Sequence, residues 1–117
     1  MSVIEAAQVD GRDRRRWHRA RVRLPLRLID TDGDFRVLVG ETIDLSAGGV
    51  SVLVDGPLTG ALRATVQLEL AAGSALLCEA RVAGGGVVED GWEYRLAFAD
   101  LEVHEMEALD QVVRGAS

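Results

Sequence analysis

The stretch DLSAGGVSVLV, residues 44–54, joins two predicted β-strands through a corner of small residues. One strand, roughly residues 35–45, ends at this corner, and a second, residues 50–54, leaves it and is closed by Asp55-Gly56-Pro57. Serine and glycine favour such corners, because serine hydrogen-bonds to nearby backbone and glycine adopts conformations that other residues avoid. The stretch therefore predicts a fold of short strands separated by tight turns.

The segment before this stretch alternates between apolar and polar residues. In residues 21–28, RVRLPLRL, valine and leucine alternate with arginine and proline, which is the period of a strand that buries one face. Pro25 belongs to the outward-facing set, which predicts that this strand lies at a sheet edge or carries a bulge. The turn signal TDGD, residues 31–34, separates it from the strand that follows.

Three more strands are predicted in the second half of the chain. Residues 65–70, 78–82 and 92–98 alternate apolar with polar side chains, and the triplet Gly84-Gly85-Gly86 is expected to break the pattern between the last two. Together with the earlier segments they make six short strands. Such a series predicts a mostly β protein, a small six-stranded antiparallel barrel or sandwich.

The end of the chain changes to a helical period. Met106, Leu109 and Val113 recur at i, i+3 and i+7, acidic residues precede them, and Arg114-Gly115 follows. The pattern predicts one amphipathic α-helix, residues 101–114, whose apolar side would cover one mouth of the barrel.

The composition is that of one soluble globular domain. The chain has 117 residues, of which 48% are apolar and 27% charged. No apolar run approaches the roughly 20 residues that span a bilayer, so a cytoplasmic location without membrane insertion is expected. Cys78 is the only cysteine and there are two histidines, which excludes a disulfide framework and leaves no spacing for a zinc site.

The net charge of −6 conceals an asymmetry along the chain. Residues 1–27 contain eight arginines and three acids and carry +5, whereas residues 28–117 contain five arginines and sixteen acids and carry −11. The sequence thus predicts a basic, anion-binding segment attached to an acidic body.

Two motifs stand apart from the strand pattern. Arg15 and Arg19 form RxxxR, and Asp44, Ser46 and Gly49, beginning 25 residues after Arg19, form DxSxxG. Each motif alone is weak. A basic run can be a solvated tail that attracts any polyanion, and D-x-S-x-x-G can be a strand-end turn whose side chains cap local backbone.

Together, in this order on a small barrel, the motifs resemble the signature of the PilZ domain family. The resemblance extends over residues 14–109 and includes the strands VRLPLRL, GGVSVLV and YRLAF and the closing helix. PilZ domains are six-stranded barrels that bind the bacterial second messenger cyclic di-GMP, so the resemblance implies a receptor for this dinucleotide.

The predicted organisation is a flexible leader followed by one PilZ domain. The leader covers residues 1–11, which show no sustained period, and the domain covers residues 12–114. Within the domain we expect an arginine-rich arm at 12–20, the barrel at 21–99 and the helix at 101–114.

The resemblance and the chemistry of the ligand select the same residues. Arginine pairs with phosphate oxygens, reaches the O6 and N7 atoms of guanine and stacks on its face, so it suits a ligand with two phosphodiesters and two guanines. A carboxylate matches the N1–H and N2–H donors of guanine, a hydroxyl can bond a phosphate, and glycine permits close approach. The predicted ligand-binding residues are Arg14, Arg15, Arg19, Asp44, Ser46 and Gly49, with Arg16, Gly48 and Trp92 as further candidates.

Two finer expectations concern the amino-terminal arm. Arg14 stands directly before RxxxR, where an additional guanidinium could stack on a second, intercalated dinucleotide, so two ligand molecules per domain are predicted. Like-charged arginines with few apolar anchors predict an arm that is mobile without ligand and ordered by it. The side chains of Trp17 and Trp92 are expected first to pack against the domain, and as an alternative to contact a guanine of the ligand.

Three functions remain open on the sequence alone. The first is a cyclic di-GMP receptor that signals through an unidentified protein effector in motility, attachment or exopolysaccharide control, and the second is a PilZ-like adaptor that binds no nucleotide. The third, a nucleic-acid-binding barrel, does not explain Asp44 or the acidic body, so no nucleic-acid polymer is expected as a partner. An enzyme is not expected, because neither Ser46 nor Cys78 has a histidine within a predictable distance, and no cofactor or metal is implied.

Overall fold

The computed structural model describes residues 18–60, 62–71 and 73–116, which form one antiparallel sheet and a helix. The elements in chain order are β2 (Arg19–Ala20), β3 (Pro25–Ile29), β4 (Val37–Ser46), β5 (Gly49–Val54), β6 (Arg63–Ala71), β7 (Ser74–Val88), β8 (Gly91–Ala99) and α2 (Val103–Ala116).

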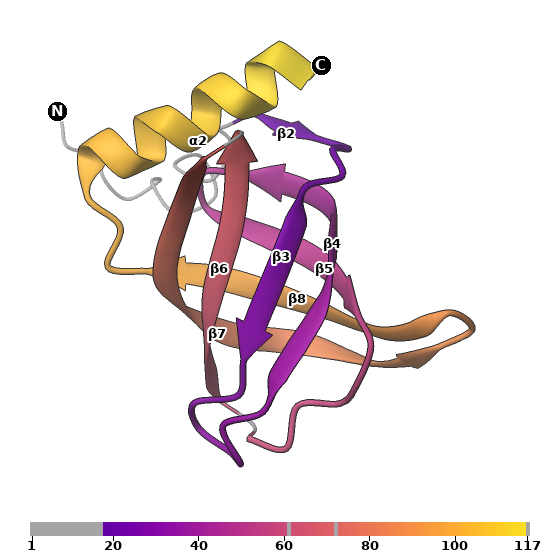
Figure 1. The fold of residues 1–117 in the computed structure, drawn as a ribbon. Helices are drawn as coiled ribbons and strands as arrows, with labels where there is room; N and C mark the ends of the chain where they lie inside the picture. Colours follow the sequence, from indigo (N-terminus) through magenta and orange to yellow (C-terminus); the bar gives the residue numbers. More distant parts are fainter. Residues whose placement is uncertain (1–17, 61, 72, 117) are drawn as a thin grey trace, which may run out of the picture.

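The sheet closes on itself to form a barrel (Figure 1). The strand order is β2-β4-β3-β6-β7-β8-β5, and an additional β4–β5 pairing joins the two sides, so six strands form the closed wall. The short strand β2 is added outside this ring, against the end of β4. The predicted six-stranded antiparallel barrel with a carboxy-terminal helix is therefore confirmed, with one extra strand.

The core consists of the inward-facing set of each strand. Leu28, Leu45 and Leu68 are fully buried inside the barrel, as the period-two patterns of their strands require. Helix α2 lies across one end of the barrel beside β2 and buries Leu109 and Val113 (Figure 1). The helix thus covers one mouth, as its apolar side predicts.

The strand expected over residues 21–28 is interrupted in the structure. The chain pairs at β2, leaves the sheet, and returns as β3 at Pro25. The Thr42 hydroxyl accepts a hydrogen bond from the Leu24 amide at 2.8 Å and donates one to the Val22 carbonyl, so a side chain replaces part of the ladder. Next to Thr42, the pairing of β4 with β5 shifts register. Because Thr42 is distant in the sequence, the alternation of residues 21–28 alone predicted one continuous strand.

The expectation that the strand of Pro25 lies at a sheet edge or carries a bulge is wrong, because β3 pairs on both sides without a register shift. Strand β3 lies inside the sheet, between β4 and β6. Pro25 is its first residue, and a proline is tolerated there because it begins the ladder without interrupting it.

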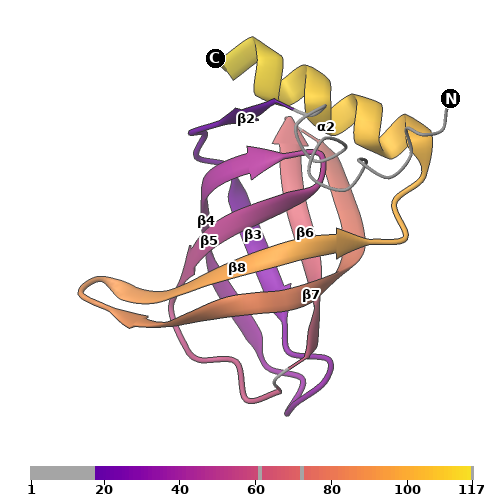
Figure 2. The same cartoon turned by 180° about the vertical axis from the view of Figure 1, so that it is seen from behind.

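The glycine triplet does not end its strand, contrary to expectation. Strand β7 continues through Gly84-Gly85-Gly86 to Val88, with only a register shift between Val82 and Gly84. Gly85 has a φ of +143°, and a Cβ there would lie 2.2 Å from the Glu93 carbonyl oxygen, so only glycine fits. The register shift falls at Ala83, just before the triplet, and the glycines stay paired with β8 in a hairpin that extends beyond the barrel (Figure 2).

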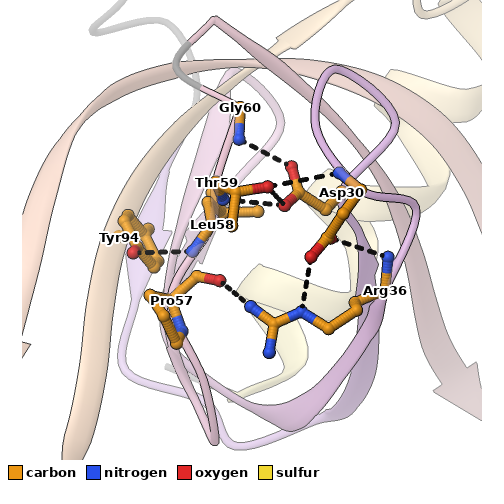
Figure 3. Close-up of polar contacts among 8 residues, drawn as sticks. Asp30, Arg36, Pro57, Leu58, Thr59, Gly60 and Tyr94 are labelled. Atoms are coloured by element: carbon orange, nitrogen blue, oxygen red, sulfur yellow. Dashed lines mark hydrogen bonds and ion pairs between the residues drawn. The ribbon is translucent and has the colours of Figure 1, made fainter.

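The barrel end away from α2 is held by a buried acid (Figure 3). Asp30 is fully buried, and its carboxylate accepts hydrogen bonds from the Thr59 amide at 2.7 Å, the Thr59 hydroxyl at 2.6 Å and the Gly60 amide at 3.1 Å. Burial alone would raise the pKa of the Asp30 carboxyl, but these hydrogen bonds hold the pKa below its ordinary value of 3.8. Asp30 thus ties the β5–β6 connection to the end of β3.

Candidate functional site

The small-residue corner is built around the hydroxyl of Ser46. Ser46 ends β4 and Gly49 begins β5, and the Ser46 Oγ accepts hydrogen bonds from the Gly48 amide at 3.1 Å and the Gly49 amide at 3.3 Å. A Cβ at Gly49 would lie 2.5 Å from the Leu96 carbonyl oxygen of β8. Ser46 and Gly49 therefore shape the corner, which is the strand-end role that the sequence left open.

The two motifs meet at this corner. In β2, Arg19 is the register partner of Ser46 and Ala20 that of Leu45. The Arg19 Nη1 donates a hydrogen bond to the Asp44 Oδ1 at 3.1 Å, and the exposed fractions of the two side chains are 63% and 26%. An ion pair this exposed contributes little to stability, so both charged groups can exchange partners at small cost.

The strand register extends this site across the outer face of the barrel. One row of register partners runs Asp44, Ser51, Arg95, Gly84, and the next runs Ser46, Gly49, Ala97, Arg81. We call the surface formed by these eight residues and Arg19 the motif face. Its centre consists of small residues, of which Ser46, Gly49 and Ser51 are buried and Ala97 is half-buried, and exposed arginines lie on both sides.

Sequence reasoning missed Ser51, Arg81 and Arg95 as members of this face. The alternation of their strands already places each of them on the side opposite to the core residues Val50, Val52, Ala80 and Leu96, although Ser51 is itself buried. What the sequence lacked was the strand order, which brings β8 beside β5 and β7 beside β8. No local pattern encodes that neighbourhood.

The remaining predicted residues fall into two groups. Arg14, Arg15 and Arg16 lie outside the described residues, as do Trp17 and the leader at 1–11. Of the predicted arm at 12–20, Arg19 and Ala20 form β2.

Trp92 is not brought to the corner. It pairs with Val54, whereas Gly49 pairs with Ala97, so Trp92 stands five residues farther along β8, about 16 Å at the rise of a strand. Its side chain packs, half-buried, against the core. The packing role is the one that its position supports.

Cys78, the single cysteine of the chain, is poorly suited to act as a nucleophile. Burial, with a smaller contribution from the Glu105 charge, raises the pKa of the half-buried Cys78 thiol to about 11. Within residues 18–60, 62–71 and 73–116, no group of three or more His, Cys, Asp or Glu side chains is arranged to hold a metal ion. In the same ranges no helix is long and apolar enough to cross a membrane.

Three solved structures share this fold at low sequence identity. Inhibitor of motility (MotI/DgrA) from Bacillus subtilis superposes with a TM-score of 0.70 at 17% identity over 87% of this chain; the chain spans only 50% of that protein. The PilZ domain of YcgR from Escherichia coli, with c-di-GMP, gives a TM-score of 0.68 at 14% identity, covering 88% of this chain and 91% of that one.

The third structure is the PilZ domain of CeSA from a cellulose synthesizing bacterium, with a TM-score of 0.59 at 22% identity, covering 84% of this chain and 96% of that one. No curated protein matched the sequence. At these identities the structures establish the fold alone. The family model of the PilZ domain, however, matches residues 13–115, which is most of the chain, and the protein therefore belongs to the PilZ domain family.

Proposed function

We propose that this PilZ domain is a receptor for cyclic di-GMP that passes the signal to a protein partner. The observation that carries the proposal is the contact between Arg19 and Asp44 beside the Ser46–Gly49 corner, which joins the two halves of the motif in one site. A PilZ domain is a ligand-binding and adaptor module, which agrees with a chain whose residues suggest no catalytic site. The E. coli neighbour was solved with c-di-GMP, and the B. subtilis neighbour is named an inhibitor of motility.

The proposed binding reaction exchanges ion pairs on the motif face. Asp44 releases Arg19 and accepts hydrogen bonds from the N1–H and N2–H groups of a guanine, whose donor spacing fits the two carboxylate oxygens. Arg19 then turns its guanidinium to a phosphodiester, with which it forms charge-assisted hydrogen bonds. Since the original pair is exposed, the ligand replaces a weak interaction by stronger ones.

The adaptor without nucleotide remains the second candidate, because the Ser46 hydroxyl is already engaged with the corner backbone. A turn of this kind needs no ligand. The presence of Asp44 and Arg19 on the same face favours the receptor, since a turn alone requires neither.

The stoichiometry tests the receptor directly. If Arg14, which directly precedes RxxxR in the sequence, stacks on a second, intercalated molecule, isothermal titration calorimetry is expected to reach saturation at two cyclic di-GMP molecules per chain. The matched variant Arg14→Ala should lower the ratio to one. A ratio of one for the wild type would contradict the intercalated pair, and no heat of binding would contradict the receptor.

The amino-terminal arm is proposed to carry the signal. Fixing the backbone of one residue costs about 1–2 kcal/mol of conformational entropy, and each charge-assisted hydrogen bond contributes about 1.5–3 kcal/mol. Four or five such bonds can therefore offset the ordering of a short segment. Amide hydrogen exchange across residues 12–20 should therefore slow when cyclic di-GMP is added. Exchange that stays unchanged there while calorimetry reports binding would assign the signal to another part of the domain.

A further inference from the structure

Three of the five arginines in the acidic body gather on the outer wall of the barrel. Arg63 on β6, Arg81 on β7 and Arg95 on β8 are all exposed. Arg63 and Arg81 are register partners, and like charges directly opposite each other in a sheet destabilise it. Among the described residues this group has one ion pair, between Arg63 and Glu79 at 4.0 Å, and neither Arg81 nor Arg95 has an ion pair there. The group is therefore suited to receive an anion.

The register connects this group to the motif face. Arg95 is separated from Asp44 by Ser51 alone, and Arg81 is separated from Gly49 by Ala97 alone. Neighbouring strands lie about 4.8 Å apart, so the backbone of Arg95 stands about 10 Å from that of Asp44. The one residue between them, Ser51, has a small side chain and is buried. One dinucleotide lying on this surface can touch both.

The Arg95 side chain packs against β7. At the position where a Cβ of Gly84 would stand, the Arg95 Nη2 is 2.4 Å and the Cζ 3.2 Å away. Gly84 does not have the positive φ that would demand glycine, so its lack of a side chain serves the guanidinium. Arg95 is thus held on the wall of the barrel, turned toward the strand that carries Arg81.

We propose that Arg95, assisted by Arg81, forms a second cationic side of the site and binds the phosphodiester of cyclic di-GMP that faces away from Arg19. This proposal rests on the proposed function. The two phosphodiesters stand on opposite sides of the macrocycle, so one cluster of arginines cannot reach both. Asp44 adds a further negative charge to the same surface, which makes cations on its far side necessary.

The test compares single-arginine variants of the full chain by calorimetric titration with cyclic di-GMP. Arg95→Ala is expected to weaken binding about 10- to 100-fold, the value of one charge-assisted contact, and Arg81→Ala less. Arg27→Ala is the matched control, because Arg27 is an exposed arginine on β3, outside both rows of the motif face, and it should change the affinity less than about twofold. Thermal unfolding of each variant checks the fold.

Gly84→Ala tests the position of the Arg95 guanidinium separately from its charge. The added methyl group displaces the guanidinium, a flexible side-chain end, and should weaken binding by several-fold at little cost in stability. Combined with Arg95→Ala it should weaken binding no further. Equal affinities for Arg95→Ala and Arg27→Ala, with Arg19→Ala still impaired, would overturn this proposal and leave the receptor standing. A wild-type protein that does not bind would overturn both.

Discussion

Replacing Asp30 by alanine should lower the free energy of unfolding by about 3–5 kcal/mol, because three donors lose their charged acceptor in a buried site. Those donors are the Thr59 amide, the Thr59 hydroxyl and the Gly60 amide. A domain of this size has a total stability of about 5–15 kcal/mol, so the loss is a large part of the whole. Chemical denaturation of the two proteins measures it.

Asp32→Ala is the matched control for this prediction. Asp32 belongs to the same turn, is exposed, and accepts one hydrogen bond from the Leu62 amide at 3.2 Å. Its replacement should cost no more than about 1 kcal/mol. Equal losses for the two variants would contradict the stabilising role of burial and of the three hydrogen bonds at Asp30.

The stabilisation by Asp30 should also depend on pH. The pKa of Asp30 is lowered in the folded state, so its contribution is complete above the ordinary value of 3.8 and is lost as the pH falls through the lowered value. The difference in unfolding free energy between wild type and Asp30→Asn should therefore shrink in that acid range. A difference that stays constant from neutral pH into that range would contradict the assigned cause.

Asp44→Ala should reduce the selectivity of the binding site for guanine. If Asp44 accepts the N1–H and N2–H donors of guanine, its removal weakens binding of cyclic di-GMP about 10- to 100-fold, the value of a good bidentate pair. Cyclic di-AMP has an adenine edge that does not supply that pair of donors, so its weaker binding should change little. The ratio of the two affinities, measured by calorimetry, therefore falls.

Asp90→Ala controls for the change in net charge. Asp90 is an exposed acid in the β7–β8 turn, on the extension of the hairpin beyond the barrel (Figure 2). Both variants remove one negative charge from the chain, but Asp90 lies along the hairpin away from Asp44, where its charge is largely screened from the site, so Asp90→Ala controls for net charge alone. If Asp90→Ala lowers the ratio as far as Asp44→Ala does, Asp44 does not read the base.

The barrel could be predicted because each strand buries one face. Alternation identified six strands, and the i, i+3, i+7 spacing of Met106, Leu109 and Val113 identified the helix. The errors occurred where a distant residue decides the local structure. Thr42 interrupts the pairing expected over residues 21–28. Pairing with β8 carries β7 through the glycines, where the carbonyl of Glu93 leaves no room for a side chain at Gly85.

The candidate site was predictable only as far as its local motifs. The contact of Arg19 with Asp44 agrees with the pairing of the two motifs, although 25 residues separate them. Arg95 and Arg81 carry no motif, and they join the same face because β8 follows β5 around the barrel. Closure of a sheet is a long-range property, so residues that it brings together leave no signal in the spacing of the chain.

Calorimetric titration of the wild type and of Arg19→Ala with cyclic di-GMP tests whether Arg19 and Asp44 form part of a binding site for this dinucleotide. The wild type should bind with a saturable heat. Arg19→Ala should bind about 10- to 100-fold more weakly, because it loses a phosphate contact and leaves the Asp44 charge without a partner. Equal binding by both proteins would contradict the site, and no binding by either would identify the domain as an adaptor without nucleotide.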